Sequence, residues 1–192
     1  MPTIEAVIRP SIERGECEHM AALLDSIEDL PPLVASFFKL GATRNGWLVH
    51  GSLPGAAADD RAKLAAEGLE VDDLENRDQL AVLELDLSVQ PEEWVKPWSA
   101  RLDERLRAGF DALWFARFPI GTEESELSDV LPFEAAWMSC FDGRPVVTLC
   151  PYIVAGLDEQ QLGERRRRVS AVHDRIIDDF SALSTGGPGA GD

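Results

Sequence analysis

Short apolar runs rich in β-branched residues alternate along this chain with amphipathic stretches of ten or more residues. The apolar runs cover residues 47–50, 80–87, 111–118 and 145–150, and the helical patterns cover residues 29–41, 56–67, 91–109, 130–141 and 158–183. Continuous apolar strands are typical of a sheet buried on both faces, and a helix between two strands makes them parallel. The sequence therefore predicts an α/β fold, with a mostly parallel sheet flanked by helices.

The length of 192 residues favours one domain. We expect a lead-in segment at residues 1–16, a single α/β domain at residues 17–183 and a disordered, glycine-rich tail at residues 184–192. Residues 18–24 fit either a short strand or a helical turn. So few apolar residues do not distinguish the spacing of a strand from that of a helix.

The charge of the chain excludes several classes of partner. Lysine and arginine number 18 against 35 aspartate and glutamate residues, which gives a net charge of −17. Such a field repels phosphate backbones and anionic membrane surfaces, so we expect neither direct nucleic-acid binding nor membrane binding. The amino terminus lacks a secretory signal, which predicts a cytoplasmic protein with reduced cysteines.

The familiar motifs of nucleotide, hydrolase and zinc sites are missing from the sequence. There is no phosphate-binding loop, no Gly-x-Gly-x-x-Gly fingerprint, no Gly-x-Ser-x-Gly elbow and no Cys-x-x-Cys or His-Glu-x-x-His spacing. The sequence accordingly predicts no metal site, identifies no cofactor and favours a non-catalytic protein.

Cys150 is the best candidate for a functional residue, because it ends the apolar run 145–149 and enters the turn Cys150-Pro151-Tyr152. Ligands of open α/β sheets bind at the carboxyl ends of the strands, so Cys150 is expected to face a crevice there. The alternative is a buried cysteine that only packs, which is common for this residue type. An imidazole beside the thiol would allow ligand contact, metal ligation or nucleophilic chemistry.

Two further residues have both a functional and a structural interpretation. Glu134 lies among apolar residues, so it is either a carboxyl group with a raised pKa or an inward side chain that holds a loop through hydrogen bonds. His50 ends a strand, where it either lines a pocket or is only a terminal residue. His173 falls on the apolar face of the predicted helix 158–183, which favours packing.

The order of several short motifs resembles the MEDS domain, a sensory module named after methanogens and methylotrophs. Cys17-Glu18-His19-Met20 resembles the opening Gly-Glu-His-hydrophobic element of that family, and Phe133-Glu134 resembles its Tyr-Glu. Leu149-Cys150-Pro151-Tyr152 is similar to Leu-Cys-Gln-Tyr, with proline in place of glutamine. His173-Asp174 stands where the family often has His-Pro. The likeness spans residues 17 to about 177.

The resemblance implies a RecA-like α/β unit without a phosphate-binding loop, which senses simple hydrocarbon derivatives for transcription factors and histidine kinases. It also implies that His19 and Cys150 contact the ligand. The sequence shows no attached kinase or DNA-binding segment, so we expect output to a separate signalling protein, either a kinase or a transcription or sigma-factor regulator. A homo-oligomer remains an option.

The leading hypothesis is therefore a cytoplasmic ligand-sensing module for a small apolar or weakly polar molecule. Its expected ligand-binding residues are His19, His50, Glu134, Cys150 and Tyr152. Three alternatives stay open. They are a cysteine-dependent enzyme, a haem- or metal-responsive regulator suggested by the Cys150-Pro151 dipeptide, and a ligand-free adaptor for protein contacts.

Overall fold

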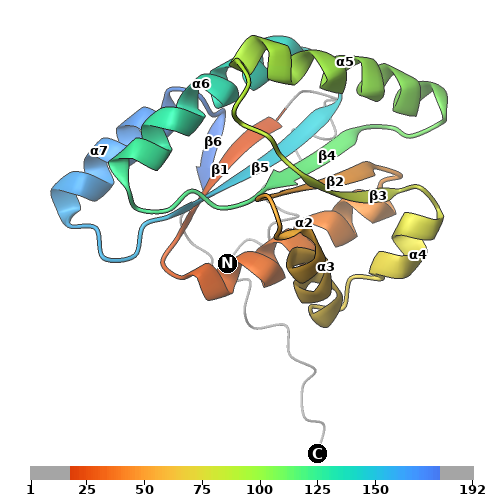
Figure 1. Ribbon diagram of the computed structural model, residues 1–192, viewed down its shortest axis with the longest axis horizontal. Coiled ribbons are helices and arrows are strands. Elements are labelled where there is room, and N and C mark those ends of the chain that lie inside the picture. The colour runs from red at the N-terminus through yellow and green to blue at the C-terminus, as the bar shows by residue number, and fades with distance from the viewer. Residues whose placement is uncertain (1–17, 178–192) are drawn as a thin grey trace, which may run out of the picture.

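The computed structural model describes residues 18–177 of the chain, which form one six-stranded parallel sheet (Figure 1). The strand order across the sheet is β3-β2-β4-β5-β1-β6. The strands are β1 (Glu18–Leu24), β2 (Trp47–Ser52), β3 (Leu80–Glu84), β4 (Leu113–Arg117), β5 (Val146–Ile153) and β6 (Arg175–Ile177). The predicted lead-in, the predicted tail and Cys17 lie outside the described residues.

Helices cover both faces of the sheet (Figure 1). One face carries α2 (Leu30–Thr43), α3 (Ala57–Ala66) and α4 (Val71–Asn76), and the other carries α5 (Pro91–Arg107), α6 (Glu124–Phe141) and α7 (Glu159–Ser170). A short 3-10 helix, η1 (Ile27–Asp29), leads into α2. Within residues 18–177, no helix combines the length and the apolar character that crossing a bilayer requires.

Each face of the sheet has its own core. The core beneath α2, α3 and α4 is mainly aliphatic, whereas the core beneath α5 and α6 is rich in aromatic rings. The ring of Trp137 in α6 lies 4.5 Å from the ring of Phe115 and 4.5 Å from that of Phe141, measured between centroids. Its indole N–H donates to Thr148 Oγ1 over 2.8 Å. This bond and the aromatic packing fix α6 against β5.

The predicted α/β fold with a parallel sheet is confirmed, and residues 18–24 form the fully buried strand β1. Two predicted segments differ. Helix α6 begins at Glu124, six residues before the predicted helical pattern 130–141, and the acidic residues Glu124 and Glu126 in its first turn stabilise that end of the helix. A further short helix, α4, was not expected.

The predicted helix 158–183 is wrong over residues 171–177, because α7 ends at Ser170, and its last part, 178–183, lies outside the described residues. The chain then turns and adds β6 to the edge of β1, with Met20 opposite Arg175. The Val169 carbonyl contacts the ring of His173 at Nδ1 over 2.8 Å, and the Asp174 N–H donates to the His19 carbonyl. Pairing with the buried strand β1 therefore outweighs the helical periodicity of this segment.

Gly46 provides a test of how closely α2 and β2 approach β4. A methyl group at Gly46 would lie 2.3 Å from Trp114 Cδ1 and 2.9 Å from the Gly41 carbonyl oxygen. We expect Gly46→Ala to lower the free energy of unfolding by about 1–3 kcal/mol, as overpacking typically does. The matched control is Gly163→Ala in α7, where the methyl meets nothing within 4 Å. It should raise stability by about 0.5–1 kcal/mol, measured by urea denaturation. Equal effects of the two changes would contradict the close contact.

Candidate functional site

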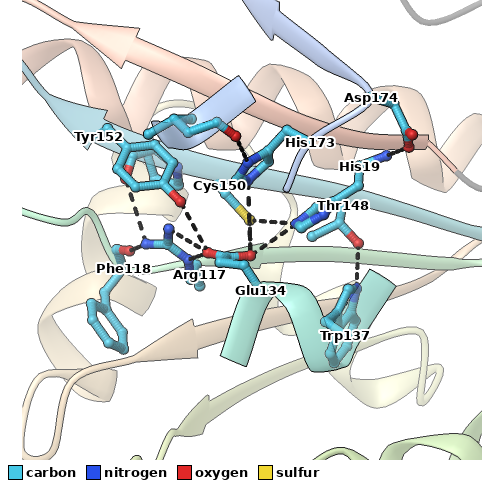
Figure 2. A network of polar contacts seen from close by, with 12 residues as sticks. His19, Arg117, Phe118, Glu134, Trp137, Thr148, Cys150, Tyr152, His173 and Asp174 are labelled. Carbon is cyan, nitrogen blue, oxygen red and sulfur yellow. Dashed lines mark hydrogen bonds and ion pairs between the residues drawn. The ribbon is translucent and has the colours of Figure 1, made fainter. Parts of the chain in front are cut away.

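Six buried polar side chains meet on the face of the sheet beneath α6 (Figure 2). They come from β1, the end of β4, α6, β5 and the turn before β6. Their exposed fractions are 0% for His19, 4% for Arg117, 4% for Glu134, 1% for Cys150, 0% for Tyr152 and 7% for His173. Buried polar groups of this kind must be satisfied by one another, so their mutual contacts decide what the site can do.

The Glu134 carboxylate stands at the centre of this cluster. Its Oε1 accepts from Arg117 Nε over 2.6 Å and from the Tyr152 hydroxyl over 3.3 Å. Its Oε2 lies 2.9 Å from His19 Nε2 and accepts from Cys150 Sγ over 3.2 Å. Burial acts to raise the pKa of Glu134, but the Arg117 charge and the bond to His19 outweigh it and hold the pKa well below its usual value. Glu134 is therefore ionised and accepts hydrogen bonds, rather than carrying the raised pKa considered from the sequence.

His19 and Cys150, which are 131 positions apart in the sequence, lie in direct contact. His19 Nε2 is 3.2 Å from Cys150 Sγ. The register of β1 on β5 produces this contact, because Cys150 lies opposite Ala21 and the side chain of His19, two residues earlier, lies on the same face of the sheet. A carboxylate only accepts hydrogen bonds, so the proton between His19 and Glu134 is on Nε2. His19 Nδ1 then has no hydrogen-bond partner among the described residues.

His173 completes the cluster from the turn between α7 and β6. Burial, and then the neighbouring His19, lowers the pKa of His173 to about 3, so its ring is neutral at pH 7. Nδ1 donates to the Val169 carbonyl over 2.8 Å, which leaves Nε2 as a bare lone pair. That lone pair lies 3.8 Å from Glu134 Oε2. The backbone of His19 is fixed by Asp174, which accepts from its N–H over 2.9 Å and donates to its carbonyl.

The electrostatics of the site do not favour a nucleophilic cysteine. Burial, and next the Glu134 carboxylate, raises the pKa of the Cys150 thiol well above its usual value. A catalytic thiol needs the opposite shift, together with access for its substrate. The Arg117 guanidinium is paired with the Glu134 carboxylate and not with the thiol. Burial acts to lower the pKa of Arg117, but the negative charge of Glu134 outweighs burial and raises it.

A small cavity adjoins the cluster on the side of Arg117 and Glu134. Its volume is about 20 Å³. The walls are otherwise almost entirely apolar and come from Leu85, Leu87, Trp94, Phe115, Phe118, Val130, Phe133, Trp137 and Thr148. A cavity of this size holds about one water molecule or a fragment of similar size. Two of the five tryptophans, Trp94 and Trp137, thus line this cavity and also pack in the aromatic core.

The structure brings together four of the five residues singled out from the sequence, namely His19, Glu134, Cys150 and Tyr152. His50 lies on the opposite face of the sheet, where Nε2 is 3.3 Å from Asp60 Oδ2 and the ring packs on Phe38. The cluster itself lies on the face of the sheet, under α6, and not in a crevice at the carboxyl edge.

The expected turn at Cys150 is absent, because Cys150 lies within β5, which continues through Pro151 to Ile153. Proline is tolerated here because β4 has ended at Arg117, so the missing N–H breaks no bond of the β4–β5 ladder. The Pro151 carbonyl still accepts from the Ile120 N–H over 3.0 Å.

Sequence reasoning missed Arg117 and assigned His173 to packing. The signal for Arg117 was a charged residue at the end of the apolar run 113–116, which demands a buried partner. His173 was hidden by the helical pattern of its segment. Together with His19, Glu134 and Cys150 it could hold a metal ion, since one potential ligand atom from each residue lies within 4.8 Å of all the others.

Comparisons with known proteins agree with this description. The family model described as MEDS, "MEthanogen/methylotroph, DcmR Sensory domain", matches residues 18–173. No curated protein matches the chain. Among solved structures, a KaiC-like protein of Pyrococcus horikoshii OT3 has a TM-score of 0.52 at 14% identity, covering 85% of this chain and 71% of its own. That likeness supports the RecA-like fold alone. A HORMA:CdnC:Trip13 complex of E. coli MS115-1 gives a TM-score of only 0.28 at 12% identity, covering 93% of this chain and 67% of its own.

The pair of Arg117 and Glu134 can be tested by removing its positive partner. Arg117→Met removes the positive partner and leaves the Glu134 carboxylate as an unpaired buried charge. We therefore expect the free energy of unfolding to fall by about 3–5 kcal/mol. The double variant Arg117→Met with Glu134→Gln should recover part of that loss. Arg61→Met is the control, since Arg61 pairs with Glu75 and Asp72 at the surface and should matter far less. Denaturant titration measures all three, and similar losses at Arg117 and Arg61 would contradict a buried ion pair.

Proposed function

The chain belongs to the MEDS family of sensory domains, and from that premise we propose that it senses a small, weakly polar organic molecule through the cluster around Glu134. The family match supports the sensory role. The nature of the ligand is argued from the site: a polar cluster adjoins a cavity whose remaining walls are almost entirely apolar. This juxtaposition is the observation that carries the proposal.

The lining of the site favours a small molecule with an apolar body and one polar end. The apolar end would contact rings such as Phe115 and Phe133, and the polar end would contact the Arg117–Glu134 pair. Pockets for small molecules commonly combine apolar walls with a few converging polar groups. The cavity of about 20 Å³ holds about one water molecule, so it admits such a ligand only if the surrounding side chains move.

Helix α6 is the element through which ligand binding would be transmitted. It contributes Val130, Phe133, Glu134 and Trp137 to the cavity wall. A ligand changes the output only if it binds one conformation more tightly than another. A ligand that requires more room than the cavity offers favours a conformation in which α6 has moved on the sheet.

The output partner in this proposal is a separate signalling protein, either a kinase or a regulator of transcription. The net charge of −17 argues against direct contact of this domain with nucleic acid. A change in the position of α6 would alter the outer surface of that helix, which offers a route to such a partner.

Binding can be tested with methanol and methylamine, which pair one methyl group with one polar group. Each probe is titrated into the full chain and followed by saturation-transfer NMR. We expect at least one of them to bind, and Val130→Leu to weaken that binding at least tenfold, because the added methylene fills the cavity. Tenfold corresponds to about 1.4 kcal/mol.

The control is Val34→Leu, which adds the same methylene to the core on the opposite face of the sheet. It should leave probe binding unchanged, while thermal unfolding of both variants shows that they remain folded. Binding of neither probe to the wild-type chain, or equal binding to the Val130→Leu variant, would count against the proposed ligand site.

A further inference from the structure

Four potential metal ligands converge at the buried cluster. One potential ligand atom from each of His19, Glu134, Cys150 and His173 lies within 4.8 Å of the other three, and all four residues are buried. Three of the pairs are 2.9, 3.2 and 3.2 Å apart, and the His173 Nε2–Glu134 Oε2 distance is 3.8 Å. Ligand atoms of a tetrahedral zinc site are separated by about 3.3–3.8 Å, given bond lengths near 2.0–2.3 Å. Small side-chain adjustments therefore bring the four atoms to that spacing.

The contact between His173 Nε2 and Glu134 Oε2 has no hydrogen atom between its two acceptor atoms. His173 Nε2 is a bare lone pair, because its ring proton is on Nδ1 and donates to the Val169 carbonyl. Glu134 Oε2 is likewise an acceptor, and it belongs to the carboxyl group whose other oxygen accepts from Arg117 and Tyr152. The two atoms face each other inside the protein, and His173 Nε2 has no hydrogen-bond partner among the described residues. Oε2 already accepts from Cys150 and faces the Nε2 proton of His19. His173 Nε2 is therefore the buried acceptor that lacks a partner, and a cation would supply one.

The surrounding contacts orient these lone pairs inward. Arg117 and Tyr152 occupy Glu134 Oε1, which leaves Oε2 to face the imidazoles and the thiol. The Val169 carbonyl fixes the orientation of the His173 ring. In metal sites, hydrogen bonds to the histidine nitrogen and the carboxylate oxygen that do not bind the metal hold the ligands in orientation.

We propose that His19, Glu134, Cys150 and His173 bind one divalent first-row transition ion, with zinc the best match. Two imidazoles, one thiolate and one carboxylate are the donor types of zinc sites, and the thiolate argues against magnesium and calcium, which prefer oxygen. This inference deepens the proposed sensory function, and it rests on that function only for what the ion would do. Glu134 belongs both to the ion site and to the cavity wall, so the ion and the organic ligand would share one carboxylate.

Binding the ion requires defined proton movements. The S–H bond of Cys150 breaks, a metal–sulfur bond forms and the proton leaves to solvent, because only the thiolate is a ligand. His19 binds through Nε2, so its ring proton moves to Nδ1. Thiolate and carboxylate then supply two negative charges to the divalent ion.

Cobalt titration of the metal-free full chain tests the site, because Co²⁺ takes the place of zinc and its bond to a thiolate absorbs in the near ultraviolet. We expect one Co²⁺ per chain, the thiolate absorption band and displacement by one equivalent of Zn²⁺. Cys150→Ser should abolish the band, and His173→Gln should weaken Zn²⁺ binding at least tenfold. The matched controls are Cys140→Ser, a partly exposed thiol, and His50→Gln, a histidine on the opposite face, and both should bind as the wild type does.

X-ray absorption of the cobalt-loaded wild-type chain supplies a measurement that does not depend on the variants folding. One sulfur with three nitrogen or oxygen neighbours is expected. A shell without sulfur, a thiolate band that persists in the Cys150→Ser variant, or no ion retained after desalting would each overturn the site.

The same metal-free and zinc-loaded preparations are then titrated with methanol and methylamine. Probe binding by a protein that takes up no metal overturns the ion site and leaves the proposed ligand in place. Metal uptake by a protein that binds neither probe leaves the ion site standing and overturns the proposed organic ligand.

Discussion

The rest of this site depends on one buried carboxylate. Glu134 enters the interior from α6, and an ionised group there is tolerated only if it is paired and hydrogen-bonded. Arg117 from the end of β4 supplies the charge, and His19, Cys150 and Tyr152 from β1 and β5 supply further contacts. A single side chain thereby connects one helix to three neighbouring strands. This explains why residues so distant in sequence converge beneath the middle of α6.

The segment after α7 closes the cluster, and Asp174, the residue after His173, sets the position of this segment. The Asp174 N–H donates to the His19 carbonyl over 2.8 Å, and its carboxylate accepts from the His19 N–H. A proline could make neither contact. Asp174 thus aligns His173 with His19 from the turn before β6, and the centroids of the two rings lie 4.1 Å apart with their planes tilted by 32°.

The alternation of strands and helices was readable from the sequence because it depends on local periodicity. The parallel sheet followed from it, and motif order led to His19, Glu134, Cys150 and Tyr152. What could not be read depends on long-range pairing. Nothing local shows that residues 175–177 join β1, so His173 was placed on a helix. The lowered pKa of Glu134 follows from Arg117, whose position beside it is set by the strand order. His50 lies on the opposite face of the sheet from the cluster, and a strand end alone does not specify a face.

The burial of the cluster bears on whether it suits catalysis or sensing. Cys150 is 1% exposed, and its thiol is kept protonated by burial and by the charge of Glu134. Turnover would require repeated entry and exit of substrate past α6, together with a more acidic thiol. Sensing requires neither, because one binding event that shifts a population is enough. An ion pair, a thiol and two imidazoles are packed beneath a single helix, and in the proposed function a molecule or ion that alters their contacts would change the position of α6. The same burial that disfavours catalysis therefore suits a domain that reports occupancy.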